Sequence, residues 1–272
     1  MSNFKVASWN VNSLRVRLPH VLDWLDSEKP DVLGLQELKL TDEQFPVEEI
    51  REAGYHASFA GQKTYNGVAL ITKSPAQDII KAMPRLDDPQ KRVIAGTVPY
   101  SLSKTESKNQ DLIRVINLYV PNGQEIGSDK YDYKLTWLSK LADFLAKEMS
   151  QYPNIIVMGD FNIAPGDSDV YDPEAWQEHI LCSTPERQAL KRLLDLGLND
   201  TFRLFEQEPE LYSWWDYRAA GFRRNRGLRI DLVLSSESLS NQCKAAYIDK
   251  APRKLERPSD HAPAVSEFAC AN

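Results

Sequence analysis

Short strand-like runs recur along the whole chain, and polar residues follow most of them. The first run begins near Lys5 and the last ends near Phe268, with few amphipathic helices between them. A doubly wound parallel sheet needs a helix after nearly every strand, so this pattern disfavours that architecture. Mixed or largely antiparallel sheets that pack together, with helices outside, fit better. Because no linker rich in proline, glycine or serine divides the 272 residues, we expect one α/β domain over 1–272.

The expected strands are apolar runs bounded by turn residues. They lie at 5–12, 32–37, 67–73, 93–98, 112–120, 154–158, 212–217, 229–234, 245–248 and 264–268. The polar stretch 101–111 lies between two of these runs. It is expected to be an exposed hairpin connection.

Three amphipathic helices are expected from apolar residues at helical spacing. Their stripes are Leu18, Val21, Leu22 and Leu25, then Leu138, Leu141, Ala142 and Leu145, and finally Leu190, Leu193 and Leu194. The third helix has a recognisable start, because Ser183 and Glu186 have capping-box spacing. Thr184 is expected to cap it and Pro185 suits its first turn, while Gly197 is the expected stop.

The charge and cysteine content limit the classes of function. With 33 Lys and Arg against 39 Asp and Glu, the formal net charge is -6, which argues against a surface that binds nucleic acid everywhere. It leaves room for a local basic face. The three cysteines have no close spacing, so neither a disulfide framework nor a thiolate zinc site is indicated. With no leader-like or membrane-spanning run, we expect a cytoplasmic protein without a membrane partner.

Carboxylates and amides collect where the strand patterns stop. They are Asn10, Asn12, Glu37, Asp160, Asn162, Asp231 and Asp260, with His261 beside the last. An oxygen-rich set with one histidine and no cysteine is what Mg²⁺ or Mn²⁺ prefers, and zinc is the weaker candidate. Taken singly, Glu37 fits a solvated strand end, Asp160 with Asn162 a turn, and His261 a surface loop. Their joint occurrence supports the metal-site hypothesis.

Nine segments carry a resemblance to a known family. They are 8–15, 35–37, 67–70, 117–123, 159–165, 200–203, 213–218, 226–231 and 258–263, and they include Gly159-Asp160-Phe161-Asn162 and Pro258-Ser259-Asp260-His261. In this order they resemble the exonuclease III group of AP endonucleases, within the endonuclease/exonuclease/phosphatase superfamily. The resemblance implies a four-layered α/β sandwich, in which two packed mixed or antiparallel sheets are flanked by helices and the active site lies at one end.

The resemblance also implies an activity. It is that of a Mg²⁺-dependent DNA repair nuclease, with Mn²⁺ as a substitute, which hydrolyses the phosphodiester 5′ to abasic sites. Removal of 3′-phosphate and other 3′-blocking groups and 3′–5′ degradation of duplex DNA belong to the same expectation. The implied partner is double-stranded DNA with abasic sites or blocked 3′ ends, bound by a monomer.

Three alternatives stay open at this stage. One is a paralogue that acts only at 3′ ends, which the sequence does not separate from an AP endonuclease. The superfamily's phosphatases and lipid phosphodiesterases rank lower, because 214–229 matches the family's DNA-contacting loop. A non-catalytic nucleic-acid-binding regulator on the same fold also ranks low, because the acidic site residues are all present.

Residue roles follow from position in the family pattern. The expected catalytic residues are Tyr119, Asp160, Asn162, Asp231 and His261. The expected metal-binding residues are Asn10, Glu37, Asp160, Asn162, Asp260 and His261. Glu37 resembles the principal metal ligand, Asp160 the group that orients or deprotonates the attacking water, and His261 a donor to the phosphate oxygen. The general base, the protonation state of His261 and the number of metal ions stay open.

Arginines and aromatic residues lie together before the last catalytic aspartate. The expected DNA-binding residues are Asn122, Trp214, Arg218, Arg223, Arg224, Arg226, Leu228 and Ile230. The stretch from Arg218 to Arg229 holds five arginines and no acid, which suits phosphate binding. The resemblance implies that Trp214, Leu228 and Ile230 line a pocket for an abasic sugar, and ordinary core packing is the alternative. A second basic stretch, 250–257, precedes Asp260.

Two features depart from the family pattern or vary within it. Some relatives place an aspartate where this chain has Asn12, so Asn12 is expected to be at most an outer-sphere group. The loop 167–176 differs between family members. Within it, Tyr171 and Trp176 are candidates to block the sugar pocket, to stack on DNA or to pack locally.

Overall fold

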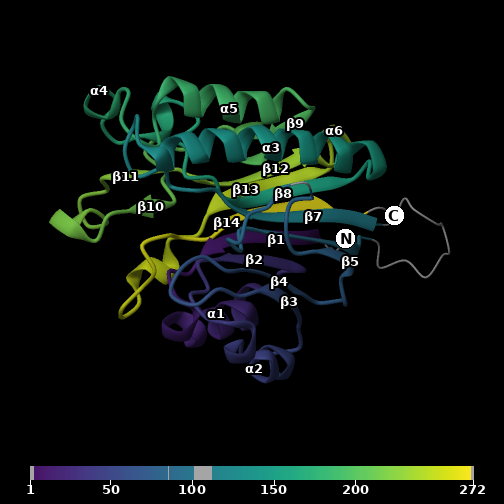
Figure 1. The fold of residues 1–272 in the computed structure, drawn as a ribbon. Helices are drawn as coiled ribbons and strands as arrows, with labels where there is room; N and C mark the ends of the chain where they lie inside the picture. The colour runs from purple at the N-terminus through teal and green to yellow at the C-terminus, as the bar shows by residue number, and fades with distance from the viewer. Residues whose placement is uncertain (1–2, 85, 101–111, 271–272) are drawn as a thin grey trace.

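The strand-forming runs fold into two six-stranded sheets that pack face to face, with helices on both outer faces (Figure 1). The structure is a computed structural model that describes residues 3–84, 86–100 and 112–270. The stretch 101–111, which we expected to be a hairpin connection, lies outside these residues. The four layers confirm the α/β sandwich.

The first sheet contains strands from both ends of the chain. Its order is β13-β14-β1-β2-β4-β3. The bounds are β1 (Asn3–Asn10), β2 (Val32–Gln36), β3 (His56–Ala60), β4 (Val68–Thr72), β13 (Cys243–Ile248) and β14 (Ala264–Ala269). β1 runs parallel to β2 and antiparallel to β14, so the last strand of the chain lies beside the first.

The second sheet has the order β5-β6-β7-β8-β12-β9. The bounds are β5 (Gln77–Ile80), β6 (Val93–Pro99), β7 (Leu112–Tyr119), β8 (Ile155–Asp160), β9 (Leu198–Asp200) and β12 (Asp231–Ser236). β7 and β8 are parallel, and the other neighbours are antiparallel. A separate ribbon pairs β10 (Trp214–Trp215) with β11 (Gly227–Leu228).

Helices cover the outer face of each sheet. Figure 1 shows α1 and α2 under the first sheet, and α3 and α5 over the second. Their bounds are α1 (Leu14–Glu28), α2 (Val47–Glu52), α3 (Asp129–Gln151) and α5 (Thr184–Leu194), with the short α4 (Pro173–Trp176) and α6 (Glu237–Ser240). Short 3-10 turns occur at Asp42–Gln44, Asp167–Asp169, Thr201–Leu204, Arg218–Ala220 and Ala251–Lys254. Among the described residues no helix could cross a membrane.

The start of α5 differs in one detail from the expectation. Ser183 is the N-cap, and it forms the capping box with Glu186. Thr184 is the first helical residue, and its hydroxyl binds Glu178 instead. The helix ends at Leu194, three residues before Gly197, which has φ +103°.

Three apolar layers hold the sandwich together. Side chains such as Val68, Leu70 and Met158 fill the space between the sheets. Another layer lies between the first sheet and α1, and a third between the second sheet and the helices α3 and α5. Full burial of one such aliphatic side chain contributes about 1.5–3 kcal/mol, so each layer contributes substantially to stability.

The strand predictions fail mainly at edges and in loops. β3, β5 and β9 were not expected, because they are short and mix polar with apolar residues at or near sheet edges. The predicted strand 212–217 is wrong over most of its length, since only Trp214–Trp215 pairs. Its aromatic residues go to different places: Trp215 packs on Phe222, Trp214 on the Leu228 cluster, and Tyr212 in the core between the sheets.

Candidate active site

The strand register brings distant polar residues to one end of the sandwich. Asn10 ends β1 opposite Gln36, so Glu37 follows at the same edge. In the second sheet Asp160 ends β8, between Tyr119 at the end of β7 and Asp231 at the start of β12. The two clusters face each other because the sheets pack face to face.

A buried amide network joins the sheets beneath this edge. The Nδ2 group of Asn117 donates to the main-chain oxygens of Leu35 and Ala69, each at 2.9 Å. Its Oδ1 accepts from Nε2 of Gln36 at 2.6 Å. These buried bonds cross from one sheet to the other, and they hold the site's two halves in register.

Asp160, Asp231 and His261 form a buried cluster. Nδ1 of His261 lies 2.8 Å from Oδ2 of Asp231, and its Nε2 lies 3.8 Å from Oδ2 of Asp160. Burial alone would lower the pKa of His261, but Asp231 and Asp160 raise it to about 10. Burial raises the pKa of Asp160, and His261 opposes that rise. The cluster therefore holds a protonated imidazole against two acids.

Glu37 belongs to the same site through Asn10. The Nδ2 group of Asn10 donates to Glu37 Oε1 and to Asp160 Oδ2, each at 2.9 Å. Tyr119 donates its hydroxyl to Glu37 Oε1 at 2.9 Å, and Lys39 lies 2.7 Å from Oε2. Burial would raise the pKa of Glu37, but Lys39 and Asn10 hold it below its ordinary value. Burial and Glu37 raise the pKa of Tyr119 well above its ordinary value, so the phenol stays protonated.

Asn162 and Asn122 form a pair of amides beside Asp160. Asn122 Nδ2 donates to Asn162 Oδ1 at 3.1 Å, and Asn162 Nδ2 donates to the Val120 carbonyl at 3.0 Å. The main-chain N–H of Asn162 donates to Asp160 Oδ1 at 2.9 Å. Asn162 thereby orients the carboxylate that we expected to act on water.

Asp260 completes the acidic edge. It accepts from Trp214 Nε1 at 3.1 Å and from Asn12 Nδ2 at 2.9 Å. Burial would raise the pKa of Asp260, but His261 and these two bonds hold it below its ordinary value. Asn12 contacts Asp260 and Lys39 rather than the central cluster, as an outer-sphere group would.

The donor set fits a hard divalent cation. Among the described residues, Asp160, Asp231 and His261 have potential ligand atoms within 4.8 Å of one another, and Asp231 Oδ1 is buried without a hydrogen-bond partner. A protonated His261 has no free lone pair, so the carboxylates are the ligands on offer. Glu37 and Asp260 add further carboxylates, and oxygen ligands suit Mg²⁺ or Mn²⁺. Two predicted ligands are already engaged: Asn10 Oδ1 accepts from the N–H of Asn12, and Asn162 Oδ1 accepts from Asn122.

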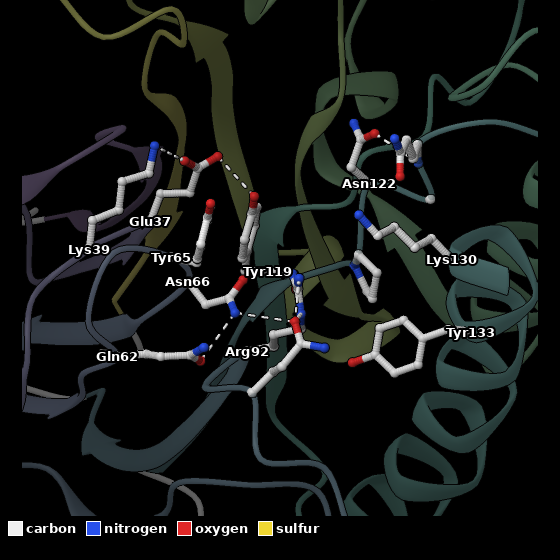
Figure 2. A pocket seen from close by; sticks show the side chains of 14 residues that line it. Glu37, Lys39, Gln62, Tyr65, Asn66, Arg92, Tyr119, Asn122, Lys130 and Tyr133 are labelled. Atoms are coloured by element: carbon white, nitrogen blue, oxygen red, sulfur yellow. Dashed lines mark hydrogen bonds and ion pairs between the residues drawn. The ribbon is translucent and has the colours of Figure 1, made fainter. Parts of the chain in front are cut away.

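A cavity of about 470 Å³ opens beside Glu37 and Tyr119. Figure 2 shows polar side chains from several loops and from the start of α3 pointing into it. They include Lys39, Gln62, Tyr65, Asn66, Arg92, Asn122, Lys130 and Tyr133. The mixture of cations, amides and phenols suits a phosphate-bearing strand that leads to the acidic cluster.

Lys39 and Arg92 are site residues that sequence reasoning missed. Lys39 bridges Glu37 and Asn12 Oδ1. The guanidinium of Arg92 lies 4.6 Å from the centre of the Tyr119 ring and donates to the Tyr119 carbonyl. Lys39 could have been found from its place two residues after Glu37. Arg92 carries no comparable signal, because only the pairing of β6 with β7 brings it there.

Four of the predicted DNA-binding arginines are exposed. Arg218, Arg223, Arg224 and Arg226 lie on the loop between β10 and β11, which projects from the site end of the molecule (Figure 1). Arg229, counted with them in the sequence, is instead buried between Asp169 and Asp200. Arg253 of the second basic stretch is also buried, and it packs over aromatic rings. Neither of these two presents its charge to DNA.

The apolar residues expected to line a sugar pocket are mostly core. Leu228 is 0% exposed and Ile230 is 1% exposed, in a small cluster with Val170 and Leu181. Both side chains are buried in this structure, and their role at a sugar pocket stays a prediction. Trp214 is partly exposed, and it contacts both this cluster and Asp260.

The variable loop packs partly on itself. Tyr171 and Trp176 meet edge to face with ring centres 6.5 Å apart. Trp176 also packs on the Leu228 cluster, and the main-chain N–H of Tyr171 donates to Gly227. Local packing therefore accounts for Trp176, while Tyr171 remains 36% exposed near the arginine loop.

Comparison with known protein families shows which family this chain belongs to. A model of the endonuclease/exonuclease/phosphatase family matches residues 7–261. The chain belongs to this family. It is 39% identical to exodeoxyribonuclease III of Haemophilus influenzae, over 97% of this chain and 99% of that protein. The resemblance stated from the sequence is thereby confirmed, and with it the prediction of a nuclease.

Solved structures share the fold closely. The 3′ phosphatase NExo from Neisseria, bound to a product DNA hairpin, is similar with a TM-score of 0.92 and 46% identity, over 98% of this chain and 99% of that chain. An AP endonuclease from Archaeoglobus fulgidus has a TM-score of 0.89 and 35% identity, over 97% of this chain and 99% of that one. These relatives include both an enzyme named for 3′ ends and one named for abasic sites.

Proposed function

We propose that this chain is a metal-dependent DNA repair nuclease that hydrolyses the phosphodiester 5′ to abasic sites and removes 3′-blocking groups. The observation that carries the proposal is the joining of Glu37 to the Asp160, Asp231 and His261 cluster through Asn10. Phosphodiester hydrolysis needs an in-line water and stabilisation of charge on the phosphate oxygens. This site offers Asp160 for the water, a protonated His261 as a donor to the phosphate, and further carboxylates that would hold a cation.

The residues have distinct proposed roles. Asp160 orients and deprotonates the attacking water, because its carboxylate is held by Asn10 and by the Asn162 N–H. The protonated His261, paired with Asp231, donates to a phosphate oxygen. Glu37 and Asp260 would hold Mg²⁺, with Mn²⁺ as a substitute. When bound, the cation supplies charge neutralisation at the phosphate and the leaving 3′ oxygen.

A 3′-end-only enzyme is the second candidate. It is favoured by the 46% identity to a structure described as a 3′ phosphatase, which exceeds the 35% to the archaeal AP endonuclease. The exposed Tyr171 is the residue that could narrow a sugar pocket. If it does, Tyr171→Ala raises cleavage at abasic sites relative to cleavage at a 3′-phosphate.

Three duplexes separate these functions. They carry an internal abasic site, a 3′-phosphate at a nick, or a plain recessed 3′ end, each assayed with Mg²⁺ and with chelator. Cleavage of the first, lost with chelator, supports the AP endonuclease. Activity on only the other two supports the 3′-end enzyme, and binding without cleavage of any would support a non-catalytic regulator.

The proposed enzyme is a single-domain monomer that acts in the cytoplasm. Residues 1–272 act as one catalytic domain, supported by the pairing of β1 with β14. The protein works as a monomer in the cytoplasm, and its DNA substrate contacts the exposed arginines of the β10–β11 loop. Release of phosphate from an inositol phosphate without cleavage of DNA would instead favour the superfamily's phosphatases.

A further inference from the structure

A buried lysine, Lys134, lies behind the candidate site. It comes from α3, and its side chain is 0% exposed. Its ammonium donates to the main-chain oxygens of Asn162 at 2.7 Å and Asn122 at 3.1 Å. It also donates to the carboxylate of Glu186 in α5. An ammonium has three N–H donors, and here three acceptors receive them.

Glu186 ties the lysine to a third loop. Besides Lys134, it accepts from the main-chain N–H groups of Leu181 and Ser183, each at 3.1 Å, and from the Ser183 hydroxyl at 2.7 Å. It is therefore the capping-box residue of α5 and the counter-ion of Lys134 at once. The pair links α3, α5 and the loops after β7 and β8.

The two carbonyl groups that Lys134 binds belong to the two site amides. Asn162 has φ +48°, a left-handed conformation that asparagine tolerates but that surrounding contacts must maintain. The loop after Asn122 packs closely on the lysine, since a Cβ added to Gly123 would lie 3.0 Å from Lys134 Cδ. Lys134 therefore holds the main chain of both loops, alongside the hydrogen bonds of Asn162 to Asp160 and Val120.

We propose that Lys134 is a positioning residue for the reaction, which sets where Asn122 and Asn162 present their amides beside Asp160. This inference rests on the proposed nuclease function. A buried ion pair is a weak source of stability compared with apolar packing, so stability alone does not explain its place here. The position of the Lys134–Glu186 pair is explained by the two loops that its ammonium holds, which carry Asn122 and Asn162.

The chain contains a matched control for this pair. Arg114 and Glu148 form another buried ion pair, which joins β7 to α3, the helix that also carries Lys134. The two side chains are 1% and 5% exposed, and their N···O distance is 2.6 Å. Arg114 lies five residues before Tyr119 on β7, roughly 16 Å away at about 3.3 Å per residue. Its loss disturbs the same layer without touching the site loops.

The first test compares Lys134→Met with Arg114→Met, using a duplex that the wild-type protein cleaves. We expect Lys134→Met to lower kcat about 10- to 100-fold with little change in KM, because small misplacements of reacting groups are costly. Both variants are expected to lower Tm by a similar amount, but Arg114→Met is expected to keep the wild-type kcat. Equal kcat losses in both variants, or no loss in Lys134→Met, would overturn the proposal.

Two further variants separate a loss of activity from a loss of stability. Lys134→Met/Glu186→Gln leaves no buried charge unpaired and keeps an amide oxygen for the capping N–H groups, so it is expected to regain Tm but to keep the low kcat. Return of the full kcat would refute a positioning role. In an Asn162→Ala background, Lys134→Met should have a smaller effect than alone, whereas independent, multiplicative effects would contradict the proposal. A wild-type protein that cleaves no duplex would refute the nuclease function itself.

Discussion

At the scale of single residues, the site depends on how each carboxylate is held. Burial pushes Glu37 and Asp160 toward their neutral forms, but only Glu37 has an ammonium, Lys39, within 2.7 Å to keep it ionised. The sequence was sufficient to name these carboxylates. It was not sufficient to find Lys39 as their partner, because a lysine after a strand is more often solvated.

The protonation of His261 gives a prediction about pH. In metal-free protein, its pKa of about 10 lies above the ordinary 6.5, so NMR should show both ring nitrogens protonated at pH 8. The folded pKa is the higher one. The pairing therefore stabilises the fold fully below about pH 6.5, and this contribution is lost as pH rises toward about 10.

Asp231→Asn supplies the control for that measurement. Removing the carboxylate should return the imidazole to the neutral form at pH 8. It should also flatten the dependence of unfolding free energy on pH between 6.5 and 10. An unchanged imidazolium signal would show that Asp231 is not the cause.

At the scale of elements, the strand register explains what sequence patterns could not reach. The long strands were predicted from their apolar runs, and the resemblance supplied the sandwich. The pairing of β8 with β12 places Asp231 opposite Asp160, some seventy residues away, and no local pattern encodes that partnership. In the arginine loop the sequence predicted too much instead of too little. Composition alone cannot separate the exposed Arg226 from the buried Arg229.

That contrast predicts different effects for two arginines three residues apart. Arg229→Met leaves Asp169 and Asp200 without their buried cation, so it should lower the unfolding free energy by about 3–5 kcal/mol. Arg226→Met removes an exposed charge, and it should change stability by less than about 0.5 kcal/mol. Urea unfolding of the two variants measures both values.

At the scale of the whole molecule, the charge distribution shapes how DNA is bound. The net charge is -6, yet four exposed arginines project from the loop between β10 and β11 at the site end. DNA binding should therefore be one-sided and sensitive to salt. The sequence indicated this polarity, but it overcounted the basic groups, because Arg229 and Arg253 are buried.

Salt dependence tests this view of the surface. Replacing Arg226 with methionine should weaken binding of all duplexes alike and reduce the slope of log K against log salt by about 1. The same substitution at Arg203, which is held by Asp169 on another loop, serves as a control and should leave the slope unchanged. Equal slopes for wild type and Arg226→Met would remove this loop from the DNA interface.

The central claim is that Asp160, joined to Glu37 through Asn10, performs metal-dependent hydrolysis of DNA. The most direct measurement is the single-turnover rate of Asp160→Asn and wild type on a saturating abasic or 3′-phosphate duplex with Mg²⁺, together with the Kd for that duplex. We predict a rate loss of about 10³-fold or more, roughly 4 kcal/mol, with DNA affinity retained. A near-native rate in Asp160→Asn would contradict the account.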